Sequence, residues 1–285
     1  MAGILSGLAD LGLGDLENVN IYEEPEKENK APVKMEPVKD VELLEKDFIY
    51  DKSYECPVCD KKFSSKVTKT GKARLLGMDM DLRPLHEGVD VQKYDVVLCP
   101  RCGYAALTRY FTYMTSVQAK FIKEQISQKV HLHEYKEETY SYLEAIERYK
   151  LALACAVVKR GKNSEKAYIC LKMGWLLRGY AEELELNPET SAEELEEVRA
   201  LEESNLQNAY KGFAEAAQTE PMPICGMDES TFDYLMAALG VHFKDYEKAS
   251  RLVAKIITSP SANIRTKDKA RELKAVLLTE LRKNK

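Results

Sequence analysis

Four of the seven cysteines of this 285-residue chain stand in two C-x-x-C pairs, Cys56 with Cys59 and Cys99 with Cys102. Each pair lies in a turn whose second residue is proline, so the two sulfurs of a pair point to one place. Two such turns brought together supply the four thiolates that tetrahedral zinc prefers. The spacing therefore predicts one structural Zn²⁺ ion with these four cysteines as its ligands, and it assigns no catalytic residue.

Three other uses of the cysteines fit the spacing less well. A redox dithiol needs a single C-x-x-C pair, which leaves the second pair unexplained. Iron–sulfur clusters usually take three closely spaced cysteines, and catalytic zinc keeps an open position and usually has fewer sulfur ligands. The odd number of cysteines also favours metal binding over a set of disulfides.

The residues beside the two turns predict the local structure that would position the sulfurs. Asp60 and Gly103 directly follow the turns, and both residue types tolerate a positive φ. Short strands are expected around the neighbouring apolar residues, which are Phe63, Val67, Tyr94, Val96 and Leu98. We therefore expect a zinc-ribbon module over residues 48–114, stabilised by its metal because so small a module has few core hydrophobes.

The long segment between the two pairs contains Asp79, Asp81 and His86, which could form a second metal or acid–base site. The simpler interpretation is a surface loop whose aspartates pair with Arg74, Arg83 or the local backbone. No nucleophile or third ligand is placed beside them by the sequence, so this interpretation is preferred.

The rest of the chain has the apolar periodicity and capping residues of α-helices. The pattern predicts helices at about 116–130, 137–160, 163–185, 191–219, 228–242, 245–258 and 264–283. Gly161 is the residue type favoured just past a helix end, and Ser191 begins a capping box with Glu194. Short connections between these helices predict an all-α array of antiparallel pairs.

An apolar triplet that begins with alanine recurs at positions i, i+4 and i+7. The three copies are Ala145/Tyr149/Ala152, Ala209/Phe213/Ala216 and Ala249/Val253/Ile256. They resemble the second helix of a tetratricopeptide repeat, and Gly174 resembles the small-residue contact of its first helix. The separations of 64 and 40 residues depart from the 34-residue period, mainly through an acidic insertion around 186–198. We expect a tetratricopeptide-like domain over 115–285, with an ordinary helical bundle as the alternative.

Residues 1–47 are predicted to be a flexible acidic arm. Residues 1–53 carry 13 acidic and 6 basic side chains, and the apolar stretch over 1–19 is interrupted by four glycines. That stretch is interpreted either as a docking segment or as a frayed terminus. No apolar run approaches the ~20 residues that cross a bilayer, and no signal peptide is recognised. A cytoplasmic protein without a membrane partner is expected.

The charge pattern and the helical array together predict a non-enzymatic adaptor for a protein or peptide. Residues 116–180 and 231–285 are basic, which would favour an acidic partner segment such as the chain's own arm, and self-association is a further option. The alternative is nucleic-acid binding by the ribbon through Lys61, Lys62, Lys66, Lys69, Lys72 and Arg74. The chain has no phosphate-binding glycine loop, nucleophile elbow or His–Glu metal motif, so no enzymatic activity is predicted, although it stays open.

The order of motifs resembles a known bacterial family. The sequence is similar to the family called domain of unknown function 2225 in the order of its motifs. These are a C-P-x-C turn, a basic segment with Asp-x-Asp, a Tyr-Asp-Val-Val-Leu stretch, and a second C-P-x-C turn followed by Gly103-Tyr104-Ala105-Ala106. The resemblance covers about residues 48–280. It implies a bacterial cytosolic protein with zinc-ribbon-like and helical-repeat parts, and it implies no substrate.

Overall fold

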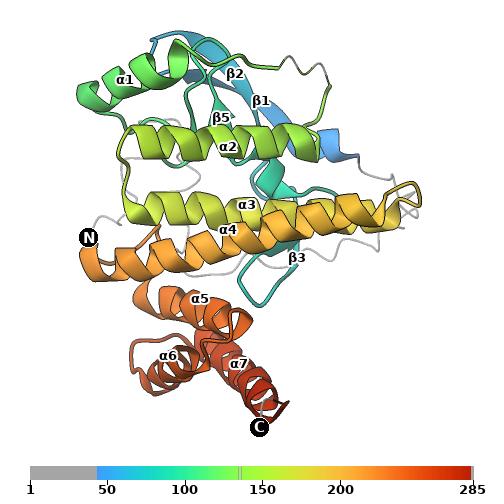
Figure 1. Ribbon diagram of the computed structural model, residues 1–285, viewed down its shortest axis with the longest axis vertical. Coiled ribbons are helices and arrows are strands. Elements are labelled where there is room, and N and C mark those ends of the chain that lie inside the picture. Colours follow the sequence, from blue (N-terminus) through green and yellow to red (C-terminus); the bar gives the residue numbers. More distant parts are fainter. Residues whose placement is uncertain (1–43, 134, 136, 284–285) are drawn as a thin grey trace, which may run out of the picture. The chain divides into compact units, whose positions relative to one another are not determined.

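The computed structural model describes residues 44–133, 135 and 137–283 of the chain (Figure 1). The predicted arm lies outside the described residues except for residues 44–47. In the described part, small antiparallel hairpins precede seven α-helices, so the predicted mainly-α class with a small β module is confirmed. None of the described helices is both long and apolar enough to cross a membrane.

The β part consists of three two-stranded antiparallel hairpins, with one short 3-10 helix before the first hairpin and one between the second and third. Its elements are η3 (Glu45–Phe48), β1 (Ile49–Glu55), β2 (Lys62–Thr68), β3 (Leu75–Met78), β4 (Pro84–His86), η4 (Val91–Tyr94), β5 (Val96–Leu98) and β6 (Ala105–Leu107). The first and third hairpins carry the two C-x-x-C turns at their tips. Strands were predicted beside both turns, but Tyr94 lies in η4 instead of a strand.

The helical part follows the predicted spans closely. Its elements are α1 (Ser116–Ile122), which continues as the π turn η5 (Lys123–Ser127), α2 (Tyr142–Val158), α3 (Asn163–Leu186), α4 (Ala192–Thr219), α5 (Glu229–His242), α6 (Tyr246–Thr258) and α7 (Ile264–Lys283). The side chains of Ser141, Ser191, Asp228 and Asp245 each accept a hydrogen bond from the backbone N–H three residues later. These caps explain where four of the helices begin.

Two helix ends differ from the prediction. The α2 helix begins at Tyr142 and not near residue 137, because Ser141 is its cap and the preceding Tyr140 ring stacks on Tyr94 at 5.1 Å. After α2, Arg160 takes the left-handed conformation with φ 55°. Gly161 was expected to be the helix-ending residue, but the chain reverses one residue earlier.

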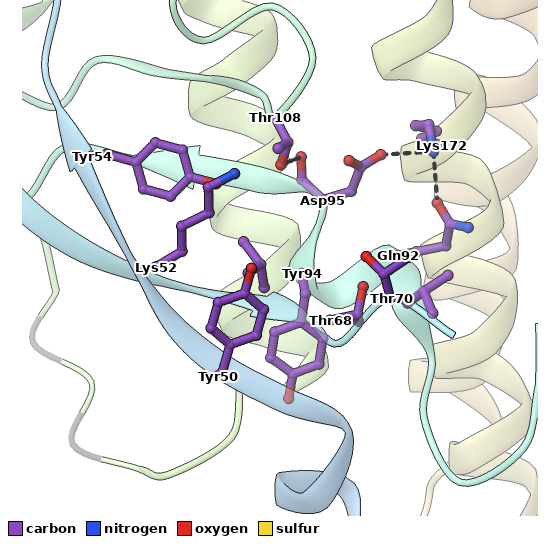
Figure 2. A pocket seen from close by; sticks show the side chains of 12 residues that line it. Tyr50, Lys52, Tyr54, Thr68, Thr70, Gln92, Tyr94, Asp95, Thr108 and Lys172 are labelled. Atoms are coloured by element: carbon purple, nitrogen blue, oxygen red, sulfur yellow. Dashed lines mark hydrogen bonds and ion pairs between the residues drawn. The ribbon is translucent and has the colours of Figure 1, made fainter. Parts of the chain in front are cut away.

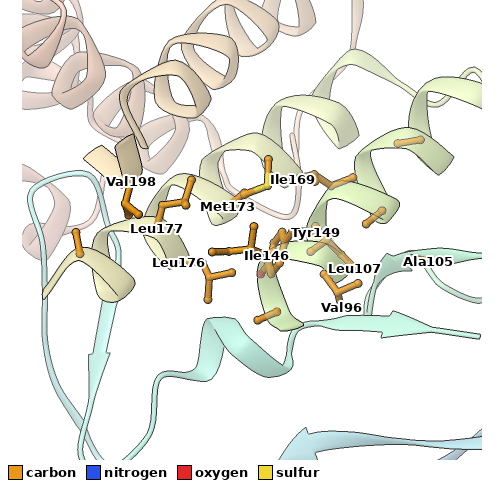
Figure 3. Close-up of a cluster of buried hydrophobic side chains, with 14 of the residues drawn as sticks. Val96, Ala105, Leu107, Ile146, Tyr149, Ile169, Met173, Leu176, Leu177 and Val198 are labelled. Carbon is orange, nitrogen blue, oxygen red and sulfur yellow. The ribbon is translucent and has the colours of Figure 1, made fainter. Parts of the chain in front are cut away.

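Buried clusters join the β part to the helices. Val96 of β5 and Leu107 of β6 pack with Tyr149 of α2 and Leu176 of α3 in one cluster (Figure 3). The Tyr149 hydroxyl also donates to the Gln92 carbonyl of η4 at 3.1 Å. Residues 43–285 accordingly form one compact unit. The predicted division into separate domains at residue 115 stays a prediction.

The helices pack in sequence order, as a helical-hairpin array requires. Figure 1 shows α2, α3 and α4 side by side, and further clusters join α3, α4 and α5 and then α5, α6 and α7. All nine residues of the three alanine-led triplets are buried. A Cβ on Gly174 would lie 2.7 Å from Leu206, so α3 approaches α4 closely at the predicted small-residue position. Burial supports the repeat pattern, although an ordinary bundle core would bury the same residues.

Gly88 and Gly71 provide a matched pair for testing local packing. Both have positive φ, 72° and 77°, but a Cβ on Gly88 would lie 2.5 Å from the buried Phe48 ring, whereas a Cβ on Gly71 would meet nothing within 4 Å. We expect Gly71→Ala to lower the free energy of unfolding by about 1–2 kcal/mol from backbone strain alone. Gly88→Ala should cost about 3 kcal/mol, because the ring must also move. Urea unfolding measures both, and equal losses would contradict the predicted clash.

Candidate metal centre

The four predicted cysteine ligands come together in the structure. Their sulfur atoms all lie within 4.8 Å of one another, with Cys56 and Cys102 at 3.6 Å and Cys59 and Cys99 at 3.7 Å. A disulfide bond would require about 2.0 Å, and all seven cysteines are free thiols. A tetrahedron with metal–sulfur bonds of about 2.3 Å has edges of about 3.8 Å, so the spacing suits one tetrahedral ion.

The two turns that present the sulfurs are built in the same way. The N–H of Asp60 donates to the Cys56 carbonyl at 2.9 Å, and the N–H of Gly103 donates to the Cys99 carbonyl at 3.0 Å. Asp60 and Gly103 have φ of 57° and 70°. Both residues therefore adopt the left-handed conformation for which their types were singled out.

Cys56, Cys99 and Cys102 influence one another's protonation. Hydrogen bonds from Cys102 and Cys56 hold the pKa of the Cys99 thiol well below its usual value, and the backbone N–H groups of Arg101 and Cys102 add to the effect. The pKa of Cys102 is raised, because its hydrogen bonds to Cys56 and Cys99, and then burial, favour the neutral thiol. Several thiolates this close together need a neutralising cation, so a divalent metal would displace the protons of these thiols.

The surroundings bury most of the site. Cys56 and Cys99 have no exposed surface, and Tyr104, Phe111 of the segment after β6, and Ile122 of α1 pack in the same cluster, while Cys59 is half-buried. Four converging sulfurs would fill the four positions of a tetrahedral ion. The arrangement suits a structural ion.

Cys155 of α2 supports the second turn, a role that sequence analysis missed. Its thiol donates to the Gly103 carbonyl at 3.7 Å and accepts from the Ala105 N–H at 3.4 Å. The sequence suggested only a small core hydrophobe, and no spacing rule connects a helical cysteine to a turn about 50 residues earlier. The contact ties the metal-binding turn to the helical array.

The two remaining cysteines do not contribute to the site. Cys170 is buried between helices. Cys225 is also buried, and it donates to the Ser164 carbonyl at 3.3 Å.

Asp79 and Asp81 are held by arginines and do not form a second centre with His86. Among the described residues, the only group of three or more side chains able to share a metal is the cysteine set. Asp79 pairs with Arg83 at 3.0 Å, as the simpler interpretation expected, but both aspartates also pair with Arg178 of α3, at 2.9 and 2.7 Å. Asp81 is buried, so this surface segment is anchored to the array, although Leu76, Met78 and Met80 beside it stay exposed.

Half of the six basic residues considered for nucleic-acid binding have contacts within the chain. Lys66 pairs with Asp51 at 3.3 Å, Lys69 donates to the Asp47 carbonyl at 3.0 Å, and Lys72 lies over the Phe48 ring. These contacts reduce the cations available for phosphate. Nucleic-acid binding stays a prediction, and a steep salt dependence of affinity would be its signature.

Comparison with known proteins gives a family but no activity. Residues 49–277 match the model of a family described as an uncharacterized protein conserved in bacteria, DUF2225. The chain belongs to this family. The match spans both C-x-x-C turns and the array almost to the end of α7, which confirms the predicted resemblance. No curated protein and no solved structure matches the chain, so for this DUF2225 member the function must be argued from its own residues.

Proposed function

We propose that this DUF2225 protein is a zinc-binding, non-enzymatic adaptor of the cytoplasm, in which a metal-stabilised β module and a helical array present a surface for a protein partner. The observation that carries the proposal is the pair of shared contacts between the metal site and α2. Cys155 holds the second turn, and the β5–β6 hairpin shares a buried cluster with α2 and α3. Such a connection fixes the module rigidly to the array.

Zinc is the ion that fits the ligand set best. Four cysteine sulfurs at the corners of a tetrahedron are typical of structural zinc, whereas magnesium and calcium prefer oxygen ligands. The free state of all seven thiols suits a reducing compartment. The ion's role would be to stabilise the module, with no part in a reaction.

The partner surface we favour is a groove of about 830 Å³ between the segment after β6, the α2–α3 turn and the α4–α5 connection. Its two carboxylates are already engaged, since Glu165 pairs with Lys159 at 2.6 Å and Glu220 accepts from the Ser164 backbone and hydroxyl. Two exposed cations remain without a carboxylate partner in the groove, Lys162 and Arg160, and Arg160 also lies over the Phe121 ring.

The groove also offers apolar surface. The Tyr113 side chain is 74% exposed, and Pro221 and Pro223 line the opposite part of the groove. An aromatic ring beside two exposed cations suits an extended acidic segment with apolar residues. A peptide of that chemistry is therefore the proposed occupant.

Binding of a short fluorescein-labelled peptide rich in glutamate and leucine, followed by fluorescence polarisation, tests the adaptor proposal. We expect Arg160→Gln with Lys162→Gln to weaken binding about tenfold, because two charge contacts at the rim are lost. Lys123→Gln with Lys129→Gln removes the same charge from exposed positions outside the groove and should leave the affinity unchanged. Equal weakening by both pairs, or equal binding of a glutamine-for-glutamate peptide, would reject the groove.

A further inference from the structure

A second cavity, separate from the proposed partner groove, lies between the β1–β2 hairpin and the η4–β5 segment. Its volume is about 360 Å³, within the range of small-molecule sites. Figure 2 shows Tyr50, Lys52 and Tyr54 of β1 on one side and Asp95 with Lys172 of α3 on the other. The cavity is therefore bounded by the β module and by the helical array together.

The far side of the cavity is neutral and already satisfied. Lys172 pairs with Asp95 at 2.7 Å and donates to the Gln92 side-chain oxygen at 3.3 Å. Its ammonium also lies over the Tyr168 and Trp175 rings, at 5.1 and 5.7 Å. The carboxylate and the amide oxygen that line the cavity are thus both engaged by Lys172.

The near side carries one cation and several hydroxyl groups, and none of the residues that line it is a carboxylate. The Tyr54 hydroxyl oxygen is buried and has no hydrogen-bond partner among the described residues. The Lys52 ammonium lies 5.4 Å from the centre of the same ring, and its side chain is exposed. Tyr50, Thr68 and Thr70 add three hydroxyl groups. A buried, unpaired O–H beside a free ammonium is unfavourable unless an acceptor, and best an anion, completes it.

The geometry points to a binding site for a small organic anion in this cavity. We propose that a carboxylate or phosphate group pairs with Lys52 and accepts from the Tyr54 hydroxyl, while the rest of the molecule lies against the Tyr50 ring. Because the Tyr54 hydroxyl is buried, the Lys52 side chain, whose ammonium lies over the Tyr54 ring, must move toward the anion as it binds. This site does not depend on the adaptor proposal, since none of its lining residues lies in the partner groove.

Titration of the zinc-loaded full-length chain with benzoate and with phenyl phosphate tests the proposal, with benzyl alcohol as the neutral probe. The backbone amide resonances of Thr68, Thr70 and Gln92 report binding, and isothermal titration gives the dissociation constant. We expect one or both anions to bind and benzyl alcohol not to bind. Binding of benzoate alone assigns a carboxylate ligand, and binding of phenyl phosphate alone assigns a phosphate ester.

The variants separate an anion site from a merely structural feature. Tyr54→Phe removes one oxygen and keeps the ring that packs on Phe63 and Phe111, so the free protein should keep its melting temperature. Anion affinity should fall about tenfold in Tyr54→Phe and in Lys52→Gln, and it should be unchanged in Lys123→Gln, which does not line the cavity. Failure of both anions to bind, equal binding of benzyl alcohol, or full affinity in Tyr54→Phe would overturn the proposal. Full affinity in Tyr54→Phe is the result expected if a water molecule, and not the anion, is the partner of the Tyr54 hydroxyl.

Discussion

Replacing Cys102 by serine is expected to reduce bound zinc from one ion per chain to almost none and to destabilise the fold severely. Structural zinc contributes on the order of 10 kcal/mol of apparent binding free energy at neutral pH. Because the site shares its cluster with α1 and α2, loss of the ion should also loosen packing outside the hairpins. We expect the free energy of unfolding to fall by at least about 5 kcal/mol, and the melting temperature by about 10–20 °C.

Cys170→Ser is the matched control for this prediction. Cys170 is also a buried cysteine, but it lies between helices and away from the four sulfurs. Its replacement should lower the free energy of unfolding by about 1–3 kcal/mol, because the serine hydroxyl would be buried, and it should leave the zinc content at one ion per chain. Elemental analysis and thermal unfolding of both variants decide the matter. Full zinc occupancy in Cys102→Ser, or loss of zinc in Cys170→Ser, would contradict the assignment.

Arg178→Met is expected to be the most damaging change outside the metal centre. The guanidinium bridges two carboxylates of the β3–β4 connection, Asp79 at 2.9 Å and Asp81 at 2.7 Å, and one of α4, Glu202 at 2.7 Å. Burial alone would lower the pKa of Arg178, but hydrogen bonds and charge from Asp81 and then Glu202 raise it above its usual value. Removing one partner from a buried network leaves the remaining charges without a counter-charge. We therefore expect the free energy of unfolding to fall by about 3–5 kcal/mol.

Arg199→Met is the control that tests whether burial of the ion pairs accounts for the large effect expected of Arg178→Met. Arg199 also pairs with a carboxylate, that of Glu185, but both side chains are almost half exposed. Loss of this exposed ion pair should lower the free energy of unfolding by about 0–1 kcal/mol. Limited proteolysis of Arg178→Met should find the β3–β4 segment released. Chemical unfolding of the two variants measures the difference in stability, and equal losses for the two arginines would contradict the network's importance.

The cysteine cluster could be predicted largely from the sequence. Its four members follow from the two C-x-x-C pairs, since each pair sets the spacing of its own sulfurs locally. Asp60 and Gly103 were likewise identifiable, because a residue type that tolerates positive φ is needed directly after each turn. Cys155 could not be predicted, because its contact with Gly103 depends on how α2 lies against the hairpin.

In the helices, too, local features could be predicted from the sequence and long-range contacts could not. Spans marked by a serine or aspartate cap, such as those that begin after Ser191 and Asp228, were found to within a residue. The start of α3 at Asn163 was also predicted, but the group that satisfies its first turn was not. The Ser164 N–H donates to Glu220 from the end of α4, a partner 56 residues away.

Local chemistry in the sequence therefore determined the cysteine ligands, the turn residues, the spans of the helices and the apolar triplets that they bury. Tertiary structure alone decided that Arg178 anchors Asp79 and Asp81, that Cys155 supports a metal-binding turn, and that Tyr54 and Lys172 face one cavity. The physical reason is that hydrogen-bonded turns and helical periodicity act over a few residues. Burial, by contrast, brings together groups about 50 to 120 positions apart, and a single sequence contains no record of which of them will meet.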